Sequence, residues 1–205
     1  MTTRHWTVAV TGASGSVYAQ RLCRDLAGRK GVRVNLVMSE AGARVIREEL
    51  GVALDLEDGP GVIRALAGAG ARNFHYDHYK DIGAGIASGT HPTEGMVVIP
   101  CTTGTLGGIA SGVSRNLIER AAEVVMKERK NLILVLRETP LSLVTIENMA
   151  RLARAGVCIL PAVPGFYHLP KTLEDVVDFL VGKVLGQMGF GHRLIRRRVK
   201  RGGAG

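Results

Sequence analysis

Arg137 and Glu138 stand side by side directly after residues 131–136, an apolar run typical of a strand that is buried on both faces. Open α/β sheets bind their ligands at the carboxyl ends of the strands. An arginine at such a point could hold an anion such as phosphate, and a neighbouring carboxyl group could give a proton to a leaving group. Taken alone, the dipeptide is also typical of an ion pair on a surface turn, so the other strand ends have to distinguish the two interpretations.

Three further polar or glycine-rich segments follow predicted strands: residues 11–15 (TGASG), Ser39, and residues 102–105 (TTGT). Because the carboxyl ends of parallel strands share one edge of a sheet, these segments are expected to converge with Arg137. Glycines in TGASG let a ligand approach the backbone, and free N–H groups at the start of the next helix could bind an anion. The loop lacks the full G-x-G-x-x-G fingerprint and a Walker lysine, so FMN fits better than NAD or ATP. A glycine turn that only tightens the first crossover is the structural alternative.

Helical and strand patterns alternate along the chain, which predicts parallel βαβ units in one doubly wound α/β domain over residues 1–190. Residues 74–89 are irregular and polar, and we interpret them as a functional or interface loop. Gly59 and Pro60 are expected to interrupt the chain before a short helix. Strands are expected over residues 6–11, 32–38, 96–99, 131–136 and 157–160. Helices are expected over residues 16–26, 41–50, 62–67, 106–110, 117–128, 142–155 (with Ser142 as N-cap) and 173–188.

The formal net charge is +9, and six of the cations lie in the tail between Arg193 and Arg201. A basic tail can bind nucleic acid or an acidic membrane, but no aromatic residues alternate with these charges, so we expect residues 191–205 to be a mobile, solvated terminus. Cys23, Cys101 and Cys158 are odd in number and unrelated in spacing, which favours neither a disulfide framework nor a zinc site. The apolar runs are too short for a membrane span, and a secretory layout is missing, so a cytoplasmic protein is expected.

Six segments resemble the UbiX-type flavin prenyltransferases. They are, in order over about residues 6–190, TGASG; MSEAG with Glu49 beyond it; IASGT; PCTTGTL; NLIERAAEVVMKERKNLILVLRETPLS; and LPAVPGFYHLPKT. The resemblance implies a Rossmann-like (flavodoxin-like) three-layer sandwich in a large homo-oligomer, commonly a dodecamer. It implies an enzyme that joins the dimethylallyl group of dimethylallyl phosphate to N5 and C6 of reduced FMN, without a metal. The prenyl-FMN product would pass to a UbiD-type decarboxylase.

The resemblance also assigns roles to individual residues. Glu138, Lys127, Glu49 and Ser14 would be catalytic, with Glu49 handling protons near the flavin ring. FMN would be held by Gly12, Ala13, Ser14, Ser39, Thr102, Thr103, Gly104, Thr105 and Arg137. The prenyl phosphate would be bound by Tyr167, Lys183, Arg120, Lys127 and Arg137, with Arg120 supplied across a subunit boundary.

These roles agree with the chemistry of the transfer. Breaking an allylic C–O bond leaves charge on the phosphate, which fixed cations and a proton donor stabilise. Lys127 and Arg137 can supply the charge, and Glu138 can supply the proton. A dry pocket would protect the carbocation-like prenyl group from water. Without the family pattern, Lys127 is typical of a surface cation at a helix end.

Three positions depart from the family pattern. Gly104 stands where many members have lysine or arginine, Lys183 where many have arginine, and Ile82 where many have an aromatic residue. Lysine at position 183 keeps the charge but loses bidentate phosphate binding. Ile82 would weaken stacking against the prenyl group or the flavin, although an aliphatic wall still excludes water.

Three other functions stay open at this point. One is an FMN-dependent decarboxylase of the cysteine-decarboxylase group, although the catalytic histidine and Asn-rich loop of that group are missing. Another is a non-catalytic FMN-binding partner, for which Lys183 and Ile82 give slight support. The third is a nucleic-acid-binding module that acts through the basic tail.

Overall fold

Six parallel strands form one sheet in the order β3-β2-β1-β4-β5-β6 within residues 3–195, the part of the chain that the computed structural model describes. Without the edge strand β3, this order is that of flavodoxin, in which the chain changes direction across the sheet beside β1. The strands are β1 (Arg4–Val10), β2 (Val32–Met38), β3 (Phe74–His78), β4 (Gly95–Cys101), β5 (Asn131–Leu136) and β6 (Cys158–Ile159).

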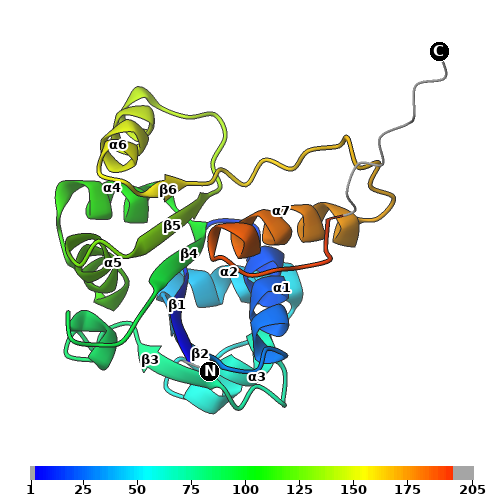
Figure 1. Ribbon diagram of the computed structural model, residues 1–205, viewed down its shortest axis with the longest axis horizontal. Helices are drawn as coiled ribbons and strands as arrows, with labels where there is room; N and C mark the ends of the chain where they lie inside the picture. Colours follow the sequence, from blue (N-terminus) through cyan, green and yellow to red (C-terminus); the bar gives the residue numbers. More distant parts are fainter. Residues whose placement is uncertain (1–2, 196–205) are drawn as a thin grey trace. The chain divides into compact units, whose positions relative to one another are not determined.

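Helices cover both faces of this sheet, which confirms the predicted three-layer α/β sandwich (Figure 1). One face carries α1 (Ser16–Ala27), α2 (Glu40–Leu50) and α3 (Gly59–Ala67). The other carries α4 (Thr103–Ser111), α5 (Leu117–Lys127) and α6 (Leu143–Arg154). The side chains of Ser39, Thr102, Asn116 and Ser142 accept first-turn N–H groups of α2, α4, α5 and α6, so the predicted N-cap at Ser142 is confirmed.

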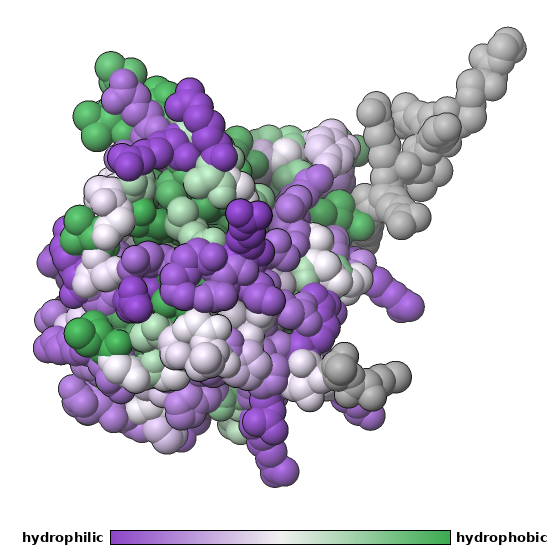
Figure 2. Space-filling model, turned by 60° about the vertical axis from the view of Figure 1, so that its left-hand side comes forward, coloured by the Kyte–Doolittle hydropathy of each residue, from purple (hydrophilic) through white to green (hydrophobic). Residues whose placement is uncertain are grey.

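The first turn of α6 leaves a hydrophobic surface exposed. Leu143, Val144 and Ile146 are 69%, 66% and 48% exposed, and Leu141 just before them is 39% exposed. Hydrophobic colour gathers at the top of Figure 2, where α6 lies. Large apolar side chains grouped in this way on a folded protein indicate a surface that another molecule covers.

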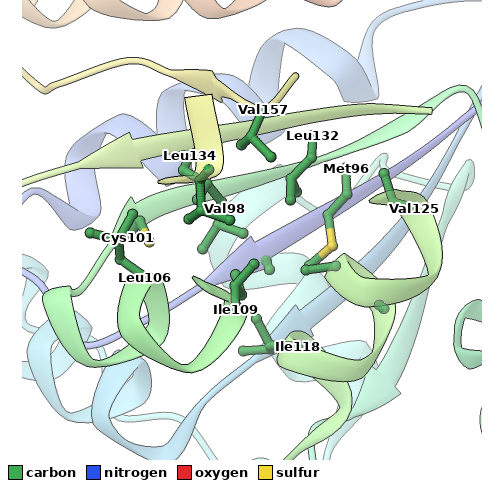
Figure 3. Packing of buried hydrophobic residues seen from close by; sticks show 14 of the residues in the cluster. Met96, Val98, Cys101, Leu106, Ile109, Ile118, Val125, Leu132, Leu134 and Val157 are labelled. Atoms are coloured by element: carbon green, nitrogen blue, oxygen red, sulfur yellow. The ribbon is translucent and has the colours of Figure 1, made fainter. Parts of the chain in front are cut away.

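The core on the α4–α5 face contains alternate apolar residues of β4 and β5. Met96 and Val98 of β4 pair in register with Leu132 and Leu134 of β5, so all four side chains point to the same face. Figure 3 shows them packed against α4 and α5. Each such side chain contributes about 1.5–3 kcal/mol on burial, so the strands are fixed behind the loops at their carboxyl ends.

Two sequence expectations are wrong. Residues 74–78 of the expected loop form the strand β3, which pairs with β2 only. The sequence of β3 is polar and so did not indicate a strand. Its Asp77 is nevertheless buried, and it accepts a hydrogen bond from Asn35 Nδ2 at 2.8 Å. Pro60 does not interrupt the chain before a helix but lies in the first turn of α3, where a missing N–H costs nothing. Residues 79–89 contain a short 3₁₀ helix, η1 (Gly85–Ala87), and no strand.

Among the described residues, 3–162 form one compact unit and 163–195 a second, which contains α7 (Leu173–Gln187). Thr172 and Asp175 form a capping box at the start of α7. The expectation of a single domain over residues 1–190 stays a prediction. The basic tail falls largely in residues 196–205, outside the described residues. Among residues 3–195, no helix has the length and apolar character needed to cross a membrane.

Candidate active site

The loops that follow β1 and β4 are joined directly, at the point where the strand order reverses. The backbone N–H of Thr11 donates to the Pro100 carbonyl at 3.3 Å, and its Oγ1 donates to the same oxygen at 2.7 Å. The N–H of Thr102 in turn donates to Thr11 Oγ1 at 3.0 Å. Thr11 is 2% exposed, so this network is a fixed joint between the TGASG and TTGT segments.

The end of β2 meets the same loops. The N–H of Ser39 donates to the Val10 carbonyl at 3.0 Å, and Ser39 Oγ accepts from the N–H of Gly42 at 3.0 Å. A Cβ on Gly12 would lie 2.5 Å from Ala41 Cβ, so only glycine lets TGASG approach the start of α2 this closely. These contacts hold the loop with Gly12 and Ser14 beside Ser39, at the same edge of the sheet.

Glu49, on the last turn of α2, binds the start of α1. Its carboxylate accepts from the N–H of Gly15 at 3.0 Å and from that of Ser16 at 2.8 Å. Burial opposes ionisation, but hydrogen bonds from the Ser14 side chain and from the N–H groups of Ser16 and Gly15 outweigh it and hold the pKa of Glu49 below its usual value. We expected these N–H groups to bind an external anion. In the structure, the N–H groups of Gly15 and Ser16 instead donate to the Glu49 carboxylate.

The hydrogen bonds of Glu49 make a pH-dependent contribution to stability. Because its pKa is lowered on folding, this contribution is complete above the usual value of 4.5 and is lost as pH falls through the lower, folded-state pKa. We expect Glu49→Gln to lower the melting temperature clearly at pH 7, with the difference from wild type shrinking below pH 4.5. Glu48→Gln, at the exposed neighbour paired with Arg44, is the matched control. A constant difference from pH 7 to pH 3 would contradict this assignment.

The first turn of α4 presents backbone N–H groups to the same edge. Thr102 Oγ1 accepts from the N–H of Thr105 at 3.0 Å and lies 2.9 Å from Thr105 Oγ1. The N–H groups of Thr103 and Gly104 belong to this first turn and have no acceptor within the helix. Together with the positive end of the helix dipole, they suit a phosphate group.

Arg137 and Glu138 follow β5 at this edge. The N–H of Arg137 donates to the Cys101 carbonyl at 3.3 Å, which fixes the residue beside the end of β4. Its Nε is buried and has no hydrogen-bond partner among the described residues. A buried guanidinium donor without an acceptor fits a missing anionic group, so the residues here are compatible with FMN. Glu138 is exposed, and its Oε1 accepts from the N–H of Thr139 at 2.9 Å.

Within one chain, Lys127 lies at the opposite edge of the sheet from Arg137 and Glu138. It ends α5, pairs with Glu128, and a Cβ on Gly89 would lie 2.8 Å from its Nζ. Since β5 begins at Asn131, Lys127 is near the amino ends of the strands, opposite Ser14, Ser39 and Thr105. Arg120, on α5, donates from Nη1 to Glu123 at 2.9 Å.

Tyr167 and Lys183 belong to the second unit, where one aromatic ring contacts both. The ring of Phe179 lies 5.5 Å from that of Tyr167, edge-on, and 5.6 Å from Lys183 Nζ. His168 stacks on Phe179 at 4.9 Å with the planes 7° apart. These contacts bring together the two residues predicted to bind the prenyl phosphate.

Comparison with known proteins identifies the family. Residues 1–185 match the flavoprotein family. A flavin prenyltransferase UbiX from Halalkalibacterium halodurans is 49% identical over 192 residues, which is 94% of this chain and 92% of that protein. The chain belongs to the UbiX flavin prenyltransferase family. The resemblance of the six sequence segments is thereby confirmed, and so is the flavodoxin-like fold.

Two solved UbiX-like structures agree with this assignment. AnUbiX (PadA1), in complex with FMN and dimethylallyl pyrophosphate, matches with a TM-score of 0.84 and 36% identity over 95% of this chain and 97% of that one. A dodecameric FMN-dependent UbiX-like decarboxylase from Escherichia coli O157:H7 matches with a TM-score of 0.85 and 39% identity, over 94% and 98%. Such matches do not favour the cysteine-decarboxylase alternative.

Sequence reasoning included Thr11 in the TGASG segment without predicting that it joins this segment to the loop after β4, and it missed the pair Arg115–Glu119. The pattern N-L-I-E over residues 116–119 could have indicated Glu119, because a glutamate three residues after an N-cap often reaches back to the preceding backbone. No comparable local signal predicts that Thr11 contacts Pro100 and Thr102. Among residues 3–195, no group of three or more His, Cys, Asp or Glu side chains is placed to hold a metal ion.

Proposed function

We propose that this protein is a flavin prenyltransferase, which transfers the dimethylallyl group from dimethylallyl phosphate to N5 and C6 of reduced FMN. The convergence of the loops after β1, β2, β4 and β5 carries the proposal, because these loops contain the residues that the resemblance assigns to FMN binding. Gly12, Ala13, Ser14, Ser39, Thr102, Thr103, Gly104, Thr105 and Arg137 would hold FMN. Reduced FMN supplies the electron-rich ring atoms that accept the prenyl group.

The chain's own residues lower the barrier by stabilising the leaving phosphate. As the allylic C–O bond breaks and the new bond to the flavin forms, negative charge collects on the phosphate oxygens. Arg137 offers a partly buried guanidinium to this charge, and Glu138 beside it gives the phosphate a proton. Within the second unit, Tyr167 and Lys183 both contact the ring of Phe179, and the resemblance assigns both to the prenyl phosphate.

We propose that the remaining cations come from a second copy of the chain. Lys127 lies at the opposite sheet edge from Ser14 and Thr105, so one chain cannot bring it to the flavin edge. The exposed hydrophobic surface of α6 supports association, and the solved relative from Escherichia coli is dodecameric. In a homo-oligomer of twelve chains, a neighbour would supply Lys127 and Arg120.

We also propose a fate for the product and a location for the enzyme, on the resemblance to the family. The prenyl-FMN product would be handed to a UbiD-type decarboxylase. A cytoplasmic location fits three cysteines that are free thiols, since the disulfides typical of secreted proteins are not formed among them.

Mass spectrometry of the flavin tests the proposal. We expect anaerobic incubation with reduced FMN and dimethylallyl phosphate to add one C5 unit to the flavin. Parallel reactions with the diphosphate identify the preferred donor, and a reaction without any donor is the control. Unmodified FMN retained by folded protein would instead support the non-catalytic FMN-binding partner.

A further inference from the structure

Glu119 is a buried carboxylate that the proposed reaction does not use. It is 2% exposed and lies in the first turn of α5. Arg115 supplies donors to it: the backbone N–H at 2.9 Å, Nε at 3.2 Å and Nη2 at 2.6 Å. A buried charge with this many charge-assisted hydrogen bonds holds its partner in one conformation. We call these two residues the Arg115–Glu119 clamp.

The clamp packs directly on the backbone of α4. A Cβ on Gly108 would lie 2.4 Å from Glu119 Oε1 and 2.8 Å from Arg115 Nη2. Only a glycine therefore lets the ion pair reach the helix at this point. α4 and the start of α5 are in contact through the clamp, with no side chain of residue 108 between them.

Arg115 also reaches the segment that would contact FMN. Its Nη2 donates to the Gly104 carbonyl at 3.3 Å, in the first turn of α4. Gly104 has no left-handed backbone, and the nearest atom to a Cβ built there is Thr102 Oγ1 at 3.9 Å, so neither conformation nor packing demands a glycine. The Arg115 guanidinium thus lies beside the first turn of α4, where few other side-chain atoms are near Gly104.

We propose that Arg115 is a positioning residue for FMN binding, which, held by Glu119, fixes the first turn of α4 through the Gly104 carbonyl. The inference rests on the proposed function, because it takes residues 102–105 as a flavin contact. A turn fixed before FMN arrives presents the N–H groups of Thr103 and Gly104 in the binding orientation, so less ordering has to accompany binding.

Arg115→Gln tests the role of the clamp, and Arg44→Gln is the matched control because Arg44 forms an exposed i,i+4 ion pair with Glu48 on α2. We expect Arg115→Gln to raise the Kd for FMN about tenfold. At saturating FMN, the transfer rate with dimethylallyl phosphate should change less than about twofold, because Arg115 touches no reacting group. Hydrogen exchange at residues 105–109 should become faster, while Arg44→Gln changes none of these quantities.

Two further variants keep the inference falsifiable if Arg115→Gln folds poorly. Arg115→Gln combined with Glu119→Gln removes the buried charge along with its partner, and the weaker FMN binding should persist at a near-normal melting temperature. Arg115→Lys should restore FMN affinity only in part, because one ammonium cannot reproduce the forked contacts. If the unaltered protein binds FMN and the double variant binds it with the same Kd, the positioning role of Arg115 is wrong and the proposed function stands. Failure of the unaltered protein to bind FMN would overturn the proposed function, and the clamp with it.

Discussion

Replacing Glu138 with Gln is expected to slow prenyl transfer by about 100- to 1000-fold while leaving the Kd for FMN unchanged. Glu138 follows Arg137 directly, at the edge where the proposed flavin-binding loops converge, and it is exposed. Glutamine has the same shape but cannot give its amide proton to the departing phosphate. The loss should therefore fall on the chemical step and not on FMN binding.

Single-turnover reactions with reduced FMN and dimethylallyl phosphate measure this step, and fluorescence titration measures FMN affinity. Glu147→Gln, at an exposed glutamate on α6, is the matched control and should react like the unaltered protein. Equal transfer rates for Glu138→Gln and wild type would remove the proton-donor role. A parallel loss of FMN affinity would instead indicate that Glu138 shapes the flavin site.

The elements that place Glu138 could be predicted because their signals are local. The strand over residues 131–136 was predicted at its observed bounds, since an apolar run between a cationic helix end and a charged dipeptide has one plausible interpretation. β3 was missed because its sequence is polar, and the partner of its buried Asp77 is Asn35, which lies in another strand 42 residues earlier. A polar edge strand is not marked by any pattern within its own sequence.

The same distinction applies to the site. Glycine and hydroxyl residues after strands indicated a flavin-binding edge, and the joint between Thr11, Pro100 and Thr102 explains why these loops meet. The sequence could not show that Glu49 occupies the start of α1, because that contact spans 33 residues. The position of Lys127 at the other edge could have been predicted, because a crossover helix that ends just before a parallel strand brings its last residues to the amino end of that strand.

Lys127→Ala is expected to lower the transfer rate about 100-fold, because a cation at the departing phosphate would be lost. FMN affinity should stay at the wild-type level, since within one chain Lys127 lies opposite the loops that we propose bind the flavin. Lys130→Ala, at a cation just past the same helix end, is the matched control. Loss of activity in both variants would indicate a general effect of charge at this end of α5.

Mixed oligomers distinguish a neighbour's Lys127 from one that acts within its own chain. If each site takes Glu138 from one copy and Lys127 from another, then co-expressed Lys127→Ala and Glu138→Gln chains assemble about a quarter of their sites with both wild-type residues. Activity should therefore return to about a quarter of the wild-type value, although each variant alone is nearly inactive. If both residues act within one chain, every chain in the mixture carries a defect, and activity stays at the level of the separate variants. The opposite placement of Lys127 and Thr105 on the sheet favours the first result.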